Sequence, residues 1–264
     1  MANLKNTHMK PSSVSPPLYH RLVAVITWIG VVVGFACLYL GLKTVDFDLD
    51  AMTDPLNQLR RASMEKADLI EWSMLCDIFG FYLLMIPGVI YIWYWLRERN
   101  PFLMAVSTVS MLLYILTGAL GGGILSILWP SLVRAYVGAS SDPVMSQILT
   151  EQFKLVTNLV YTGMWGRVEY ILIAFWVAAV SALTWSDKRA FSIFGFIGAL
   201  GSLLSAVGET FSIRSLADNA IDVYMIGVPL WVAWAAVFAW KAGKVPAEIG
   251  TADVSADAVR RHHA

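Results

Sequence analysis

The sequence predicts an all-α fold, an integral membrane bundle of six transmembrane helices with one or two outer amphipathic helices. Hydrophobic residues make up 58% of the 264 residues and charged residues only 14%. A soluble domain is nearer half apolar and a quarter charged. The apolar excess is gathered in runs about as long as the ~20 residues that cross a bilayer as a helix. The predicted spans are 22–42, 72–96, 102–128, 168–185, 191–213 and 221–240.

The chain is expected to consist of one membrane domain, residues 21–243, between two disordered cytoplasmic segments. Residues 1–20 are rich in proline and serine, and residues 244–264 form a polar tail without a lipidation motif. The first apolar run follows a polar stretch and lacks a small-residue cleavage site. This pattern is typical of an uncleaved signal anchor.

Short basic connections predict the orientation in the membrane. Arg97 and Arg99 lie between the second and third spans, and Lys188 and Arg189 between the fourth and fifth. Basic residues in short loops favour the cytoplasmic side, so both termini are expected in the cytoplasm, with the protein in the cytoplasmic (inner) membrane. Tryptophans mark both interfaces. Those expected at the outer interface are Trp72, Trp129 and Trp165.

Two outer segments carry helix start signals. Asp54-Pro55 and Asp142-Pro143 each place aspartate at the N-cap and proline at the first helical position. The first helix is expected to run unbroken into the second span. The second has an apolar face at helical spacing and is interpreted either as a lid over an outward-facing cavity or as a helix in the headgroup region.

Glycine and proline predict how the spans pack and bend. Gly30 and Gly34 form a GxxxG step, and the fifth span carries a stripe of small residues, both of which favour close helix contacts. Residues 121–123, three consecutive glycines, are expected to break the third span locally. Pro87 and Pro229 are expected to kink the second and sixth spans. The two cysteines are interpreted as buried thiols, with a disulfide left open.

Acidic residues near membrane depth are the candidate functional residues. Ionisable groups there are costly and therefore suggest function. The helical rise of ~1.5 Å per residue puts them all in the outer third of the membrane. Tyr161, Tyr170 and Tyr224 are expected as hydroxyl donors nearby. The candidate ligand- or ion-binding residues are Asp77, Glu209, Glu169, Arg167 and Asp222, and no catalytic residue is assigned.

Three interpretations of these acids are open. They form structural ion pairs with Arg167 or Arg214, they bind a proton or cation during transport, or two of them act as acid and base on a lipid-soluble substrate. Asp77 and Glu209 lie deepest and are expected to carry a site, with help from Glu169 and Arg167.

Cofactors are not expected. No histidine lies in a predicted span, which argues against haem and against histidine-based zinc or iron sites. No metal site is predicted, although an all-carboxylate site for Ca²⁺ stays open. The expected partners are membrane lipid, a small-molecule or lipid ligand, and another subunit of a membrane complex; nucleic acid is not expected.

The region from 70 to 101 resembles an uncharacterised bacterial family of small six-helix membrane proteins. A span containing Leu75-Cys76-Asp77 leads into a short basic turn, 96–101, and the later order of a polar helix, then 166–185, then 195–209, is also similar. The resemblance covers most of the chain and implies the fold. The family has no assigned activity, and it usually has aspartate where this chain has Glu209, so the resemblance supplies no site.

The sequence therefore predicts a multi-pass membrane protein with an outward-facing acidic pocket that transports or binds a small solute or lipid. The first alternative is an intramembrane enzyme that uses paired carboxylates on a hydrophobic substrate. The second is an accessory or structural subunit of a membrane complex.

Overall fold

A computed structural model describes residues 17–48 and 56–243, and every regular element in this part of the chain is helical. The Asp54-Pro55 helix start, most of the amino-terminal segment predicted to be disordered and the whole tail from residue 244 lie outside the described residues. Helix α1, Pro17–Thr44, begins inside the predicted amino-terminal segment.

Six helical segments are long and apolar enough to cross a membrane, so the protein is an integral, multi-pass membrane protein of the all-α class, as predicted. Two spans are composites of several elements. The second consists of α4 (Met64–Asp77), η1 (Ile78–Tyr82), η2 (Leu83–Met85) and α5 (Ile86–Leu96). The fourth consists of α7 (Pro143–Thr157), η3 (Asn158–Glu169) and α8 (Tyr170–Thr184). The other spans are α1, α6 (Pro101–Gly138), α9 (Arg189–Phe211) and α10 (Arg214–Ala242).

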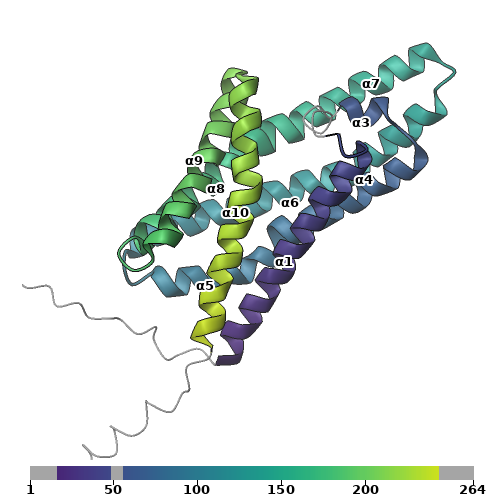
Figure 1. Cartoon of the computed structure of the whole chain (residues 1–264). Coiled ribbons are helices and arrows are strands. Elements are labelled where there is room, and N and C mark those ends of the chain that lie inside the picture. Colours follow the sequence, from purple (N-terminus) through teal and green to yellow (C-terminus); the bar gives the residue numbers. More distant parts are fainter. Residues whose placement is uncertain (1–16, 49–55, 244–264) are drawn as a thin grey trace, which may run out of the picture.

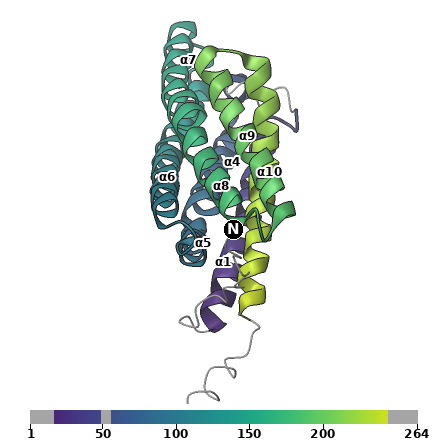
Figure 2. The same ribbon diagram turned by 90° about the vertical axis from the view of Figure 1, so that its left-hand side faces the viewer.

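The described chain begins and ends at the same end of the bundle (Figure 1). We call this the terminal end, and the opposite end, where α3 (Leu56–Arg60) and α7 lie, the far end. Helix α10 packs against α9 and α1, α8 packs against α9 and α6, and α4 packs against α1 and α6. Figure 2 shows the same helices side by side along the length of the bundle. The spans therefore surround a common interior.

The helix starts at the far end differ from the prediction in one case. The Asp142 carboxylate accepts from the backbone N–H groups of Val144 and Met145, both at 3.0 Å, which confirms the predicted N-cap. The prediction of an unbroken helix from Leu56 into the second span is wrong, because α3 ends at Arg60 and α4 starts anew. The Ser63 hydroxyl caps α4 by accepting from the Lys66 N–H at 3.2 Å. Serine is a better helix cap than a helix interior residue, which explains the restart.

The irregular turns follow the glycine and proline pattern only in part. Helix α6 runs without interruption through residues 121–123, so the predicted break there is wrong. The second span contains a π turn, η1, and a 3₁₀ turn, η2, which ends two residues before Pro87. The fourth span contains the π-helical segment η3, which includes Gly163 and Gly166. Wide turns of this kind often occur at functional sites.

A polar contact joins two connections at the terminal end. Arg99, in the turn before α6, forms an ion pair with Asp187, in the turn before α9, and donates to the Leu183 carbonyl at 2.8 Å. Hydrogen bonds from Ser186 and Arg99 hold the pKa of the Asp187 carboxyl below its ordinary value. This contact links the second and third spans to the fourth and fifth.

The contribution of Asp187 to stability should depend on pH. Its pKa is lowered in the folded protein, so the contribution is present above the unfolded value of about 3.9 and is lost as the pH falls through the lower folded value. Below that pH, Asp187→Asn and the unmodified protein should therefore melt alike. At neutral pH the variant should be less stable by less than about 1 kcal/mol, because the pair is partly exposed. Melting temperatures in detergent across this pH range test the expectation. Glu98→Gln, at an exposed position in the loop that holds Arg99, is the control, and a difference that persists at the lowest pH would contradict the assignment.

Candidate functional site

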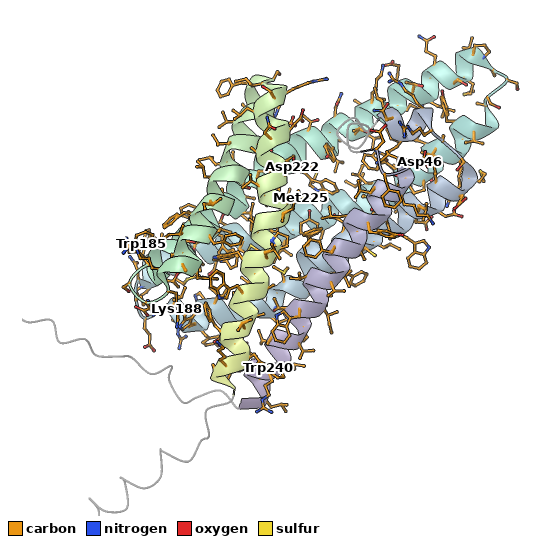
Figure 3. The ribbon with its side chains drawn as sticks, in the orientation of Figure 1. Asp46, Trp185, Lys188, Asp222, Met225 and Trp240 are labelled. Carbon is orange, nitrogen blue, oxygen red and sulfur yellow. The ribbon has the colours of Figure 1, made fainter. Side chains whose placement is uncertain are left out.

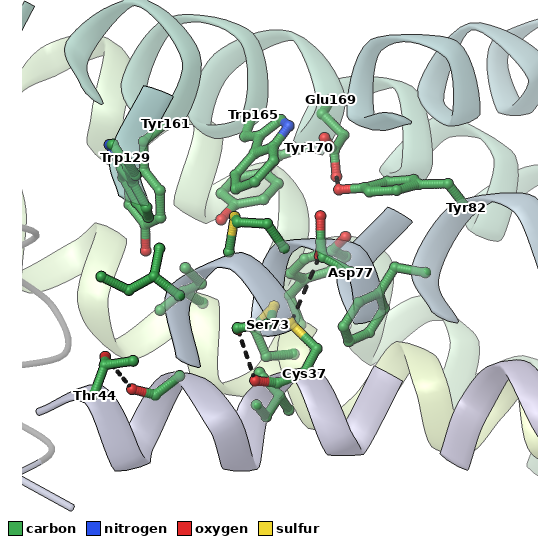
Figure 4. Close-up of a pocket in the computed structure, with 18 of the residues that line it drawn as sticks. Cys37, Thr44, Ser73, Asp77, Tyr82, Trp129, Tyr161, Trp165, Glu169 and Tyr170 are labelled. Atoms are coloured by element: carbon green, nitrogen blue, oxygen red, sulfur yellow. Dashed lines mark hydrogen bonds between the residues drawn. The ribbon is translucent and has the colours of Figure 1, made fainter. Parts of the chain in front are cut away.

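A cavity of about 120 Å³ lies among the helices in the half of the bundle near the far end (Figure 4). Its walls come from α1, α3, the second span, α6, the fourth span and α10. Thr44 and Gln58 line it toward the far end, and Tyr82 and Tyr114 line it on the deeper side. Most of the wall is apolar or aromatic. The aromatic lining residues are Phe81, Tyr82, Tyr114, Trp129, Tyr161, Trp165, Tyr170 and Tyr224.

Two acidic side chains point into this cavity from opposite walls. Asp77 is the last residue of α4 before the π turn η1, and Glu169 is the last residue of η3 before α8. Figure 4 shows the two carboxyl groups directed toward the same space. Only 8% of Asp77 and 2% of Glu169 is exposed. Both acids are therefore removed from bulk solvent, and each lies at the boundary between a π segment and an α-helix.

Each carboxylate is only half satisfied by its surroundings. The Tyr82 hydroxyl donates to Glu169 Oε1 at 3.0 Å, and the Cys37 thiol lies 4.0 Å from Asp77 Oδ1. The second oxygens, Asp77 Oδ2 and Glu169 Oε2, are buried and have no hydrogen-bond partner among the described residues. In that same part of the chain, neither acid forms an ion pair. Leaving such groups unpaired costs free energy, so their retention needs an explanation.

Glycines of α6 make room for the site. A Cβ atom at Gly118 would lie 1.9 Å from a ring carbon of Tyr82, and one at Gly122 would lie 3.3 Å from Asp77 Oδ2. These glycines therefore permit a close approach of the second span and do not interrupt α6. On the opposite side, the Ser73 hydroxyl donates to the Cys37 carbonyl at 3.1 Å and joins α4 to α1.

The other predicted site residues do not line the cavity. Asp222 lies on α10 (Figure 3) and is exposed, as is Arg167 in η3. Glu209 on α9 is half-buried behind η3, where its Cγ atom lies 3.1 Å from the position of a Cβ added to Gly166. The structure thus brings Asp77 together with Glu169 and leaves Glu209 outside. No described ion pair joins Arg167 or Arg214 to any of these acids.

Tyr82, which donates to Glu169, was not predicted from the sequence; Tyr161, Tyr170 and Tyr224, expected near the acids as hydroxyl donors, line the cavity. Tyr82 follows Asp77 by five residues, a spacing that points to different faces of an α-helix. The i→i+5 geometry of the π turn η1 brings both side chains to the same side. Only a prediction of the π turn would have identified this residue.

The two cysteines are free, and Cys37 is buried at the cavity wall. Among the described residues, no three His, Cys, Asp or Glu side chains gather as a metal ion would require.

Comparison of the chain with protein-family models, with curated proteins and with solved structures gives no match. The argument for function therefore depends on the geometry and chemistry of the site itself.

Proposed function

We propose that this membrane protein binds a small solute in the cavity as the first step of its transport. The observation that carries the proposal is the pair Asp77 and Glu169, which line the same cavity and each have a buried oxygen without a hydrogen-bond partner among the described residues. Intramembrane acids that do not stabilise the fold through a partner are candidates for ligand binding. The cavity occupies one half of the bundle, which favours a binding site over a continuous channel.

We further propose that the terminal end faces the cytoplasm of a bacterium, with the protein in the inner membrane, and that the chain belongs with the uncharacterised six-helix family described above. Figure 3 shows Trp185, Lys188 and Trp240 toward this end. The guanidinium of Arg97 lies 4.9 Å from the Trp93 ring centroid, and that of Arg189 lies 5.3 Å from the Trp185 ring centroid. Basic side chains over interfacial aromatic rings support a cytoplasmic interface, so the cavity would open outward.

Labelling of Cys37 tests whether the cavity is an open binding site. In a Cys76→Ser background, Cys37 is the single thiol of the chain and lines the cavity. We expect a membrane-impermeant thiol reagent at alkaline pH to modify Cys37 in sealed vesicles when it is added on the outer side. The variant without cysteines is the negative control, and complete labelling after denaturation in detergent is the positive control. Complete labelling after denaturation without any labelling of the native protein would contradict the proposal.

The alternatives predict different results. An enzyme that uses Asp77 and Glu169 as acid and base would form product in detergent, without a sealed compartment. An accessory subunit would copurify with its partners, and their assembly would fail when it is deleted. Of the three functions, only transport requires both a sealed compartment and the charged form of Asp77 and Glu169.

A further inference from the structure

We propose that the solute is a small organic ammonium ion, a protonated amine held between the carboxylates of Asp77 and Glu169 and the aromatic wall of the cavity. This inference depends on the proposed binding function and adds the chemical class of the ligand.

The acids favour a cation that can donate hydrogen bonds. No lysine or arginine lies among the described residues that line the cavity, so no protein cation balances Asp77 and Glu169 there. Two carboxylates that share a buried space repel each other when both are charged, and a cation between them relieves this repulsion. The N–H groups of an ammonium ion would also satisfy Asp77 Oδ2 and Glu169 Oε2, for which the described part of the chain offers no hydrogen-bond partner.

The aromatic wall favours an organic cation over a metal ion. Ring faces attract alkylammonium groups, and eight of the lining residues are aromatic. A hard metal ion such as Ca²⁺ prefers six to eight oxygen ligands. The hydroxyls that line the deeper side are already engaged, since Tyr82 donates to Glu169 and the Tyr114 and Tyr224 hydroxyl oxygens lie 3.1 Å apart in a hydrogen bond. The cavity therefore combines charge with ring faces.

The volume limits the ligand to a small amine. The cavity measures about 120 Å³. An engineered protein cavity of roughly 150 Å³ accepts benzene, which indicates the size of molecule that fits. A short alkylammonium ion such as butylammonium is within this limit, whereas a lipid acyl chain is not.

A set of three probes of similar size but different charge tests the inference. Butylammonium, 1-butanol and butyrate are added to the purified full-length protein in detergent at neutral pH, and binding is followed by melting temperature and by tryptophan fluorescence, because Trp129 and Trp165 line the cavity. We expect butylammonium to bind at least about tenfold more tightly than 1-butanol, the order expected for a hydrogen bond to a charged group, and butyrate not to bind.

Matched variants locate the binding. Asp77→Asn and Glu169→Gln should each weaken butylammonium binding by about tenfold and leave 1-butanol unaffected. Asp218→Asn and Glu65→Gln replace exposed acids near the far end and should change the binding of neither butylammonium nor 1-butanol. Leu38→Phe, which narrows the cavity, should weaken every probe that binds there. The melting curve of each variant without probe shows whether it is folded, and the two acid variants provide independent tests.

The outcomes separate this inference from the proposed function. If 1-butanol binds as tightly as butylammonium and Leu38→Phe weakens both, the cavity binds solutes and the ammonium assignment is overturned. If no probe binds although the outer thiol reagent reaches Cys37, the ammonium assignment is again overturned while the open cavity stands. If no probe binds and Cys37 is inaccessible, both proposals fail.

Discussion

Gly118→Ala is expected to destabilise the bundle strongly, although it adds a single methyl group. The new Cβ would lie 1.9 Å from the Tyr82 ring, and the ring cannot move away freely, because Tyr82 is only 3% exposed and its hydroxyl is bonded to Glu169. Added volume in a packed interior typically costs about 1–3 kcal/mol. The melting temperature of the purified variant in detergent measures the effect, and we expect a loss of several degrees or a failure to accumulate folded protein.

Gly123→Ala is the matched control on the same helix. A Cβ at Gly123 meets no atom within 4 Å, so this variant should melt like the unmodified protein or slightly higher, since alanine favours the helix. Tyr82→Leu should restore part of the stability of Gly118→Ala, because the smaller side chain vacates the space that the methyl group needs. Equal melting temperatures for Gly118→Ala and Gly123→Ala would show that the close contact between α6 and η1 is not present.

The double variant Asp77→Asn/Glu169→Gln is expected to melt higher than the unmodified protein while losing affinity for butylammonium. The substitutions keep the shapes of both side chains and remove two buried acids that have no ion-pair partner among the described residues. A buried acid without an ion-pair partner costs free energy at neutral pH whether it stays charged or takes up a proton, so its removal should stabilise the fold by on the order of 1 kcal/mol or more. Opposite effects on stability and binding are typical of residues retained for function.

Asp68→Asn/Glu71→Gln is the corresponding double variant for partnered acids. Asp68 and Glu71 pair with Arg134 at 2.7 and 2.9 Å, and their replacement should leave the melting temperature unchanged or slightly lower. If the melting temperature of Asp77→Asn/Glu169→Gln instead falls by several degrees, the two acids stabilise the bundle and the structural interpretation of the cluster is correct.

Features that depend on local sequence could be predicted. The six spans follow from the length of the apolar runs, and the Asp142 N-cap follows from a side chain that bonds its own neighbouring backbone. Helix α6 nevertheless extends to Gly138, ten residues beyond its predicted end at 128. Hydropathy reports the apolar part of a helix and does not detect its continuation outside that part.

The pairing of Asp77 with Glu169 could not be predicted, because helical rise gives depth and does not show which face of a helix meets the interior. The sequence predicts Trp165 at the outer membrane interface, and it therefore places Glu169, four residues later, close to the membrane surface. The fourth span in fact begins at Pro143, so Trp165 lies well inside a helical segment of 42 residues and is only 9% exposed. Trp129 is also buried, at 2% exposed, and both tryptophans belong to the cavity wall. Trp72 is 62% exposed, and its position at the outer interface stays a prediction.

The π turn η1 changes which side chains of the second span lie on the same face, and it leaves the length of the apolar run unchanged. Over the same residues, a regular α-helix would place Tyr82 about 140° around the helix axis from Asp77, so the two side chains could not both face Glu169. The apolar run would stay long enough to cross the bilayer. Insertion and site formation are therefore encoded separately, the first in the length of the run and the second in the local helical geometry between Asp77 and Tyr82.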